Sequence, residues 1–349
     1  VKTQDARKLR QRKDRIRYRL RPRNFEATDR PVFSATNPRY EMSGRTRCAR
    51  AGGIGAIHAM AKRIGLVDAI DEALELLKVH LPYHESDHVL NIAYNVLSGH
   101  TRLEDLELLR HDEAYMDMLG TPRIPDPTTA GDFLRRFEPR DIVALMDAVN
   151  ALRVPIWDRQ PAALLETAVI DADGTLVGTR GEKKAGMSLS YKGIWGYHPL
   201  LISLANFKEP LFLVNRAGHV PSHEDAAVWI DKAIALCKQS FAGVLLRGDT
   251  DFSLTRHFDR WDEEGVRFVF GYDAHPNLVQ IAESLPDSAW TRLERRPKYE
   301  VATQPREKRA NAKEAVVVAK EYRNLRLVSE DIAEVRYRPS ACRKTYRLV

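Results

Sequence analysis

Cysteine is scarce in this 349-residue sequence, and long hydrophobic runs are missing from it. The three cysteines, Cys48, Cys237 and Cys342, are odd in number and far apart, which favours a reducing compartment over a disulfide framework. None belongs to a C-x-x-C pair, so a structural zinc site is not expected. No stretch reaches the roughly 18 consecutive apolar residues that span a bilayer, and the N-terminus lacks the apolar segment of a signal peptide. We therefore expect a soluble, cytoplasmic protein.

Acidic residues are sparse at the two ends of the chain. Residues 1–24 hold 11 Lys or Arg and 2 Asp, and residues 291–349 hold 16 basic and 8 acidic residues. Because the whole chain carries +7, residues 25–290 carry −10. A basic arm fits contact with a phosphate backbone, and a disordered solubilising tail is the alternative. The candidate DNA contacts in the arm are Arg12, Lys13, Arg15, Arg17 and Arg19.

Four segments are predicted along the chain. Residues 1–50 are polar and basic, which indicates a largely unstructured arm. Residues 51–160 show apolar residues at helical spacing, which predicts a helical N-terminal domain. Residues 161–285 carry short apolar runs bounded by Gly, Pro and Asn, in the order three strands, helix, strand, helix, strand. This order predicts a mixed sheet of an α/β core like that of ribonuclease H. Residues 286–349 are basic and strand-like; we expect the start of a mostly β insertion, truncated at Val349.

Two pairs of carboxylates close predicted strands of the core. Asp171 and Asp173 in `DADGT` stand at positions i and i+2 of a strand, so they share a face, and Asp249 and Asp251 in `GDTD` repeat the pattern. Open α/β sheets bind ligands at the carboxyl ends of their strands. Carboxylates that converge there raise each other's pKa unless a cation neutralises them. Oxygen ligands suit Mg²⁺ or Mn²⁺, and two such ions can act on a phosphodiester.

A phosphatase of the haloacid dehalogenase type is one alternative. `DADGT` matches the nucleophile motif of such enzymes, with Asp171 as the attacking residue. Against it, about 160 helical and basic residues precede the motif, and consecutive strands follow where that fold needs helical crossovers. A basic arm also has no use in a small-molecule phosphatase. The pattern therefore favours chemistry on DNA.

Four motifs together resemble the DDE transposases of bacterial insertion sequences. They are `VIDADGT`, `KKAGMSLSYKGIWGYHPLLISLAN`, `NRAGHVPSHEDAAVWIDKAI` and `LLRGDTDFS`, and the resemblance runs from about residue 40 to the C-terminus. It implies a ribonuclease-H-like fold in which Asp173 and Asp249 are the first two catalytic carboxylates and metal ligands. It also implies two Mg²⁺ (or Mn²⁺) ions, hydrolytic nicking followed by strand transfer at terminal inverted repeats, and a homodimer on double-stranded DNA in the bacterial nucleoid. Asp171 and Asp251 remain the competitors for the two metal positions.

The third carboxylate of the resemblance has no counterpart that we assign. In the family a catalytic Glu lies on a helix after the β insertion, which we expect beyond Val349. Glu321, Glu330 and Glu334 lie in strand-like or turn-like sequence and are not assigned this role. The chain is therefore expected to be inactive in this form, and a non-catalytic DNA-binding remnant of a transposable element is a further alternative.

Other side chains near the carboxylates allow two interpretations. Lys192 in `YKG` is predicted to contact DNA, and Arg247 to orient a carboxylate or a phosphate. His198, which precedes Pro199, is interpreted as a structural turn residue rather than a metal ligand. Trp195, Trp229 and Trp261 are predicted to pack in the core rather than to stack on bases.

Overall fold

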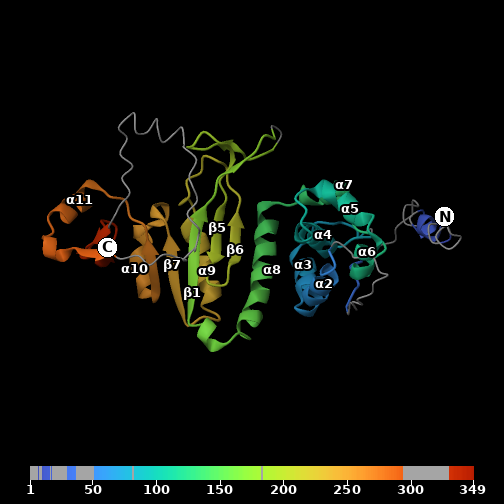
Figure 1. Cartoon of the computed structure of the whole chain (residues 1–349), viewed down its shortest axis with the longest axis horizontal. Coiled ribbons are helices and arrows are strands. Elements are labelled where there is room, and N and C mark those ends of the chain that lie inside the picture. The colour runs from blue at the N-terminus through green and yellow to red at the C-terminus, as the bar shows by residue number, and fades with distance from the viewer. Residues whose placement is uncertain are drawn as a thin grey trace, which may run out of the picture. The chain divides into compact units, whose positions relative to one another are not determined.

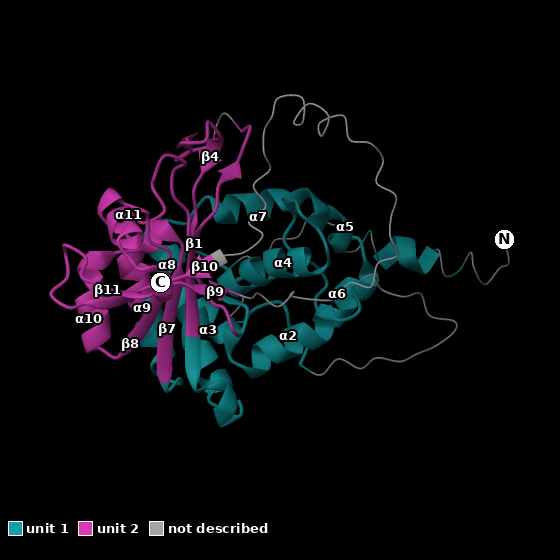
Figure 2. Ribbon diagram, turned by 60° about the vertical axis from the view of Figure 1, so that its left-hand side comes forward, with its two compact units in different colours: residues 1–168, 207–212, 232–242 teal, residues 169–206, 213–231, 243–349 magenta. Residues whose placement is uncertain are grey.

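The structure, a computed structural model, describes residues 7, 10–15, 17, 30–36, 51–80, 82–181, 184–293 and 330–349. The chain divides into two compact units, which Figure 2 colours separately. Unit 1 comprises residues 1–168, 207–212 and 232–242, and unit 2 comprises residues 169–206, 213–231 and 243–349. Cys237 and Cys342 are free and buried, whereas Cys48 lies outside the described residues.

Amphipathic helices make up most of the described part of unit 1 (Figure 1). They are α2 (Ile54–Arg63), α3 (Leu66–Ala73), α4 (Glu85–Leu97), α5 (Leu106–Arg110), α6 (Glu113–Leu119), α7 (Pro127–Leu134) and α8 (Pro139–Trp157), with 3-10 turns at Leu103–Asp105 and Ala162–Leu164. Asp112 and Asp126 cap α6 and α7 by accepting backbone N–H groups of the first turn. The apolar stripes meet in one core that contains Ile70, Leu106 and Tyr115.

Two described pieces of the basic arm have defined structure. Residues 10–15 are helical, where the sequence predicted little fixed structure, and Asp14 pairs with Arg17 one turn later at 3.7 Å. Residues 30–36 pack onto the helices, and Phe33 is only 2% exposed. Asp87 holds this piece, because its carboxylate accepts the N–H groups of Val32 and Phe33 at 3.0 and 3.1 Å.

A mixed five-stranded sheet carries the candidate site. Its strands are β1 (Thr167–Gly174), β5 (Leu200–Leu204), β6 (Glu209–Val214), β7 (Gly243–Gly248) and β8 (Val266–Phe270), in the spatial order β6-β5-β1-β7-β8. β5 runs antiparallel to β1, with Asp173 opposite Leu201, and β8 runs parallel to β7. Helix α9 (Ala226–Cys237) connects β6 to β7, and α10 (Phe258–Glu263) connects β7 to β8. This order of three strands, helix, strand, helix, strand confirms the predicted ribonuclease-H-like α/β core.

A second, three-stranded sheet interrupts the connection from β1 to β5. It consists of β2 (Val177–Gly178), β3 (Ser188–Leu189) and β4 (Trp195–Tyr197), with β4 in the middle. The first strand of the core ends at Gly174, and the next residues form β2, which pairs with β4.

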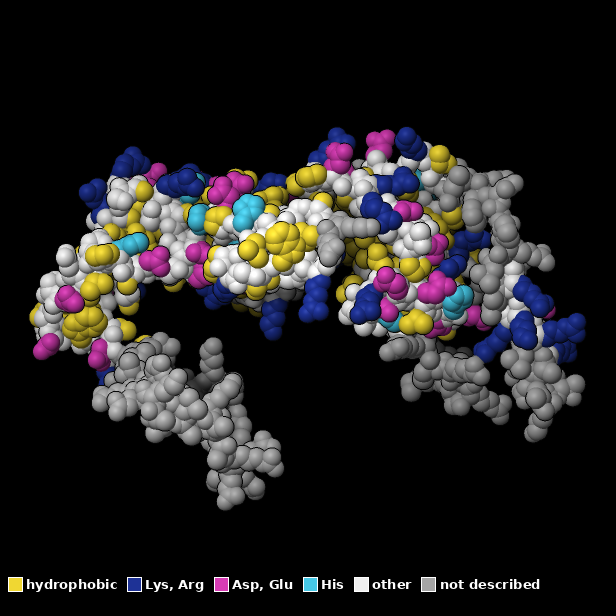
Figure 3. Space-filling model, turned by 90° about the horizontal axis from the view of Figure 1, so that it is seen from above, with side chains coloured by type: hydrophobic (Ala, Val, Ile, Leu, Met, Phe, Trp, Pro, Cys, Tyr) yellow, Lys and Arg dark blue, Asp and Glu magenta, His cyan; other side chains and the backbone are white. Residues whose placement is uncertain are grey.

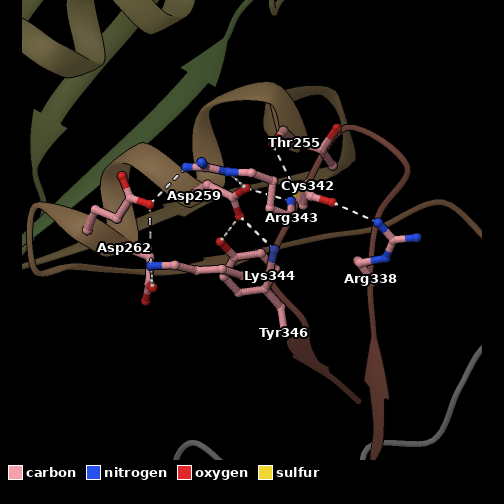
Figure 4. A network of polar contacts seen from close by, with 9 residues as sticks. Thr255, Asp259, Asp262, Arg338, Cys342, Arg343, Lys344 and Tyr346 are labelled. Atoms are coloured by element: carbon pink, nitrogen blue, oxygen red, sulfur yellow. Dashed lines mark hydrogen bonds and ion pairs between the residues drawn. The ribbon is translucent and has the colours of Figure 1, made fainter.

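Further short elements follow β7 and β8. They are the 3-10 turns Thr250–Phe252, Thr255–His257 and Asp287–Ala289, helix α11 (Pro276–Glu283), and the strands β9 (Thr291–Leu293), β10 (Glu330–Ile332), β11 (Val335–Tyr337) and β12 (Tyr346–Leu348). β9 pairs with β10, and β11 forms a hairpin with β12. Figure 4 shows how the segment that leads into β12 contacts Asp259 of α10. Among the helices of the described residues, none is long and apolar enough to cross a membrane.

Candidate active site

β1 and β7 are neighbours in the sheet and run parallel (Figure 1). Before the two strands begin, the amide of Ala242 donates to the carbonyl of Leu165 at 2.9 Å. Near their ends, Arg247 on β7 pairs with Asp171 on β1. Because the contacts advance together along both strands, Asp173 and Asp249 follow two residues later at the same edge of the sheet. Neighbouring strands therefore bring the two predicted metal ligands to a common edge.

The two carboxylates at this edge are open to solvent. Asp173 is exposed, and among the described residues its carboxylate has no hydrogen-bond or ion-pair partner. Asp249 is also exposed and caps the 3-10 turn that follows β7, with its Oδ1 accepting the amide N–H of Asp251 at 3.0 Å. Each carboxylate thus presents oxygen to an approaching ligand.

Asp171 differs from Asp173 although both lie on the same face of β1. Arg247 donates to both oxygens of Asp171, from Nε and from one terminal nitrogen, each at 2.7 Å. These bonds raise the pKa of the Arg247 guanidinium above its ordinary value. Of the two roles predicted for Arg247, orienting a carboxylate is the one observed. The charge of Asp171 is compensated within the protein, whereas that of Asp173 is not.

Each exposed carboxylate stands beside a glycine that allows a close approach. A Cβ on Gly174, which follows Asp173, would lie 2.8 Å from His198 Nε2 and 2.8 Å from Ser222 Oγ. A Cβ on Gly248, which precedes Asp249, would lie 2.8 Å from the Cβ of Phe252. All three distances are shorter than a Cβ atom tolerates, so glycine is needed at both strand ends for the observed packing.

A loop after β6 supports the end of β1 from one side. His198 is 3% exposed and donates from Nδ1 to the carbonyl of Val220 at 2.7 Å. Arg216 donates to three backbone carbonyls, those of His198, Ser222 and Glu224, at 2.8 to 3.1 Å. The structural role predicted for His198 is confirmed. We expect the guanidinium of Arg216 to hold the loop as one piece, because it ties both of its sides.

A protein family of known activity matches this chain. The family described as transposase DDE domain group 1 matches residues 34–327, which is most of the chain. The chain belongs to this family. No curated protein matches it.

Membership of the DDE transposase family fixes the general activity of the chain. Enzymes of this family act on DNA in transposition and use divalent metal ions. Neither the family match nor the site favours the phosphatase alternative. Asp171, the nucleophile in that alternative, is held on both oxygens by Arg247, which leaves it poorly placed to attack phosphorus.

Asp251 lies beside Asp249 in this transposase, whereas the three glutamates that were not assigned a role lie on other elements or outside the described part. Asp251 is exposed one position into the turn capped by Asp249. Glu334 pairs with Arg347 at 2.7 Å, and Glu330 lies on β10. Glu321 lies outside the described residues. Across the described ranges, no three Asp, Glu, His or Cys side chains gather closely enough to hold a metal ion.

The predicted DNA contacts of the transposase fall on two elements. Arg12, Lys13, Arg15 and Arg17 are exposed in the helical part of the arm, and Arg19 lies outside the described residues. Lys192 lies exposed in the turn between β3 and β4, with its Nζ 5.3 Å from the centroid of the Tyr191 ring.

Sequence reasoning missed two features of this transposase site. The prediction that Trp195 packs in the core is wrong, because Trp195 is 50% exposed, whereas Trp261 is fully buried as predicted. The clamp made by Arg216 was not foreseen either. Its only signal was an arginine among the turn residues of `NRAGHVPSHED`, and its three partners are backbone carbonyls that no sequence pattern marks.

Proposed function

We propose that this chain is a DNA transposase whose Asp173 and Asp249 hold Mg²⁺ or Mn²⁺ for hydrolysis and strand transfer at the ends of an insertion sequence. One observation carries the proposal: two exposed carboxylates close neighbouring parallel strands, while Arg247 compensates the third nearby carboxylate, Asp171. This asymmetry favours Asp173 over Asp171 as the ligand. Asp251 is disfavoured because it stands beyond the strand end, inside the turn that Asp249 caps.

The donor set fits a hard divalent cation. Both groups are carboxylates, which suit Mg²⁺ and Mn²⁺, and no sulfur or imidazole lies among the proposed ligands. Two such ions, when bound, activate the attacking oxygen and stabilise the leaving oxygen of a phosphodiester. The protein contributes position: Gly174 and Gly248 allow close packing at the strand ends, and Arg247 occupies both oxygens of Asp171.

Two carboxylates make an incomplete site. The described residues supply no third acidic side chain to the pair, so we infer that a further donor completes it from outside this part of the chain. With two ligands, metal binding is weak and the second ion is held least well. We therefore propose that the 349-residue chain by itself binds DNA and metal but does not cleave.

The basic arm and the helices are proposed to hold DNA. In the view of Figure 3, Lys and Arg side chains lie among Asp and Glu over the described surface, without a broad expanse of one sign. The arm, by contrast, has 11 basic and 2 acidic residues in its first 24 positions. We propose residues 1–50 as the arm, 51–160 as the DNA-binding domain, 161–285 as the catalytic core and 286–349 as the start of an insertion. A homodimer on terminal inverted repeats in the bacterial nucleoid completes the proposal.

Mn²⁺ binding tests the two proposed ligands directly. Asp173→Asn and Asp249→Asn are each expected to weaken Mn²⁺ binding, measured by electron paramagnetic resonance, by at least about tenfold, since each removes a ligand charge. Asp132→Asn, an exposed carboxylate on α7, is the matched control and is expected to bind as the parent does. Loss of binding in Asp171→Asn or Asp251→Asn, but not in Asp173→Asn, would overturn the assignment.

A further inference from the structure

The three-stranded sheet after β1 leaves one apolar face in solvent. Val177 stands opposite Tyr197, and Leu189 stands opposite Trp195. Residues opposite each other share a face, and Trp195 and Tyr197 are two positions apart on β4, so all four side chains lie on the same face. We call these four residues the outer face. Val177, Leu189 and Trp195 are 46%, 54% and 50% exposed.

The opposite face of this sheet is already engaged. It carries the small residues Gly178, Ser188 and Gly196. The Ser188 hydroxyl accepts the amide N–H of His219 at 2.9 Å and lies 2.7 Å from His219 Nδ1. The amide of Gly218 donates to the carbonyl of Gly196 at 3.1 Å. The loop after β6 therefore fixes the small-residue side, and the large side chains remain outside.

The turn between β3 and β4 extends the apolar surface and adds charge to it. Tyr191 is 77% exposed and Ile194 is 40% exposed, and Gly193 at φ 71° closes the turn. Lys192 lies beside the Tyr191 ring, at 5.3 Å from its centroid. The tip of the hairpin thus exposes the Tyr191 ring with the Lys192 ammonium beside it.

The charge of this segment has the opposite sign to its surroundings. Residues 174–197 hold four basic residues and one acidic residue, within a central region of net charge −10. Arg180, Lys184 and Lys192 form no ion pair with any described residue. A second copy of the chain on this face would bring like charges together. A polyanion would complement the positive charge of this face instead.

We infer that the outer face and the Tyr191–Ile194 turn bind unpaired bases of the DNA strand that reaches Asp173. Exposed apolar surface marks an interaction site, and aromatic rings flanked by cations suit unstacked bases and their phosphates. The surface also begins close to the metal ligands, because β2 starts at Val177, shortly after Asp173. This inference rests on the proposed function, because it requires the chain to hold DNA at that strand end.

Binding of two DNA probes to the 349-residue protein tests the inference. One probe is a plain duplex, and the other is the same duplex with a run of unpaired thymines at one end. The wild type is expected to bind the second probe more tightly, measured by fluorescence anisotropy. The double variant Tyr191→Ala/Trp195→Ala is expected to lose about tenfold in affinity for the unpaired probe, since it removes two stacking rings. The affinity of the double variant is expected to depend on salt as that of the wild type does, because the substitutions remove no charge.

Two control variants and two further measurements separate this role from others. Trp290→Ala removes a 38% exposed tryptophan from another element and is expected to change nothing. Lys192→Ala is expected to flatten the salt dependence instead. Sedimentation of each variant reports self-association, and circular dichroism reports folding.

Three outcomes would overturn the inference alone. The first is that the wild type binds both probes equally, and the second is that the double variant binds as Trp290→Ala does. The third is that the double variant changes oligomeric state and keeps its affinity for DNA, which assigns the face to a protein contact. Failure of the wild type to bind either probe would count against the proposed function as well.

Discussion

Asp171 and Asp173 stand two residues apart on one strand face but differ in their electrostatic state. Arg247 compensates Asp171 with two hydrogen bonds of 2.7 Å, and Asp173 has no such partner in the described residues. Sequence could place both carboxylates at a strand end, because the i and i+2 spacing fixes their face. It could not choose between them, because the choice depends on a residue of β7 far along the chain.

His88 makes the stability of the helical unit depend on pH. The ring is 3% exposed and stacks on Phe133 at 4.4 Å, and its burial lowers its pKa to about 4. In the unfolded chain the histidine pKa is near 6.5. Between pH 6.5 and pH 4 the ring is therefore protonated in the unfolded chain and neutral in the folded one. The contribution of His88 to the free energy of unfolding is therefore fully present above about pH 6.5, and it decreases as the pH drops toward 4.

Urea denaturation at pH 7 and pH 5 measures this effect. From the two pKa values, we expect His88 to account for a loss of about 2 kcal/mol in the free energy of unfolding at pH 5. His88→Leu removes that part of the pH dependence, whereas His111→Leu, at an exposed histidine, leaves it. Asp71 and Asp87, whose pKa values burial raises, contribute with the opposite sign in every variant. Equal pH dependence in parent and His88→Leu would contradict the prediction.

The long apolar runs of the core were predictable at the scale of the element, and the short strands were not. β1, β5 and β7 each bury alternate residues in a run bounded by Gly or Pro. β2 and β3 have two residues each, and their stability comes from pairing with β4 and from the loop after β6. Such strands leave no periodic signal. This explains why the exposure of Trp195 was missed.

The arm is an element whose role a salt titration can establish. Replacing Arg12, Lys13, Arg15, Arg17 and Arg19 by Ala is expected to weaken DNA binding and to flatten its salt dependence. The slope of log affinity against log salt falls by about 0.9 for each phosphate that the arm no longer neutralises. Arg347→Ala, which removes an exposed cation of β12 outside the arm and the helical domain, is the control and is expected to keep the slope. An unchanged slope in the arm variant would make the arm a solubilising tail.

One carboxylate of α10, Asp259, accepts three hydrogen bonds from the C-terminal hairpin and the segment before it (Figure 4). Asp259 accepts the amide N–H groups of Arg343 and Lys344 and the phenol of Tyr346, at 2.6 to 3.3 Å. These hydrogen bonds lower the pKa of Asp259, the phenol contributing most. The attachment is therefore at full strength above the ordinary aspartate pKa and weakens as pH falls through the lowered value.

Amide hydrogen exchange reports on this attachment. Asp259→Asn is expected to speed exchange of the backbone N–H groups of Arg343 and Lys344. The neutral side chain of asparagine accepts these hydrogen bonds more weakly than the carboxylate of Asp259 does. Asp262→Asn removes only the ion pair with Lys344 and is expected to have little effect. Similar exchange rates in the two variants would show that the hairpin is held by packing against the rings of Phe258 and Phe268 instead.

For the whole molecule, the order of elements was predictable from the sequence, and an incomplete set of metal ligands was expected from it. Alternating strand and helix patterns leave few arrangements for a sheet, and the ribonuclease-H-like order follows from them. A metal site depends on donors that converge from distant parts of the chain. β1 and β7 are neighbours, so the strand ends that carry Asp173 and Asp249 lie at the same edge of the sheet. The family's third carboxylate has no counterpart in the described residues.

The incomplete donor set leads to a prediction for the whole chain. The 349-residue protein is expected to bind DNA and, weakly, Mn²⁺, and to nick no strand in either Mg²⁺ or Mn²⁺. A longer form that adds a helix with a glutamate is expected to nick DNA carrying the element ends, since a third oxygen donor fixes the second metal and the attacking water. In that form Asp173→Ala or Asp249→Ala should abolish cleavage, as should chelation of the metal. Metal-dependent nicking by the 349-residue chain would instead place the third carboxylate within it, and Glu321, Glu330 and Glu334 would be the first residues to substitute.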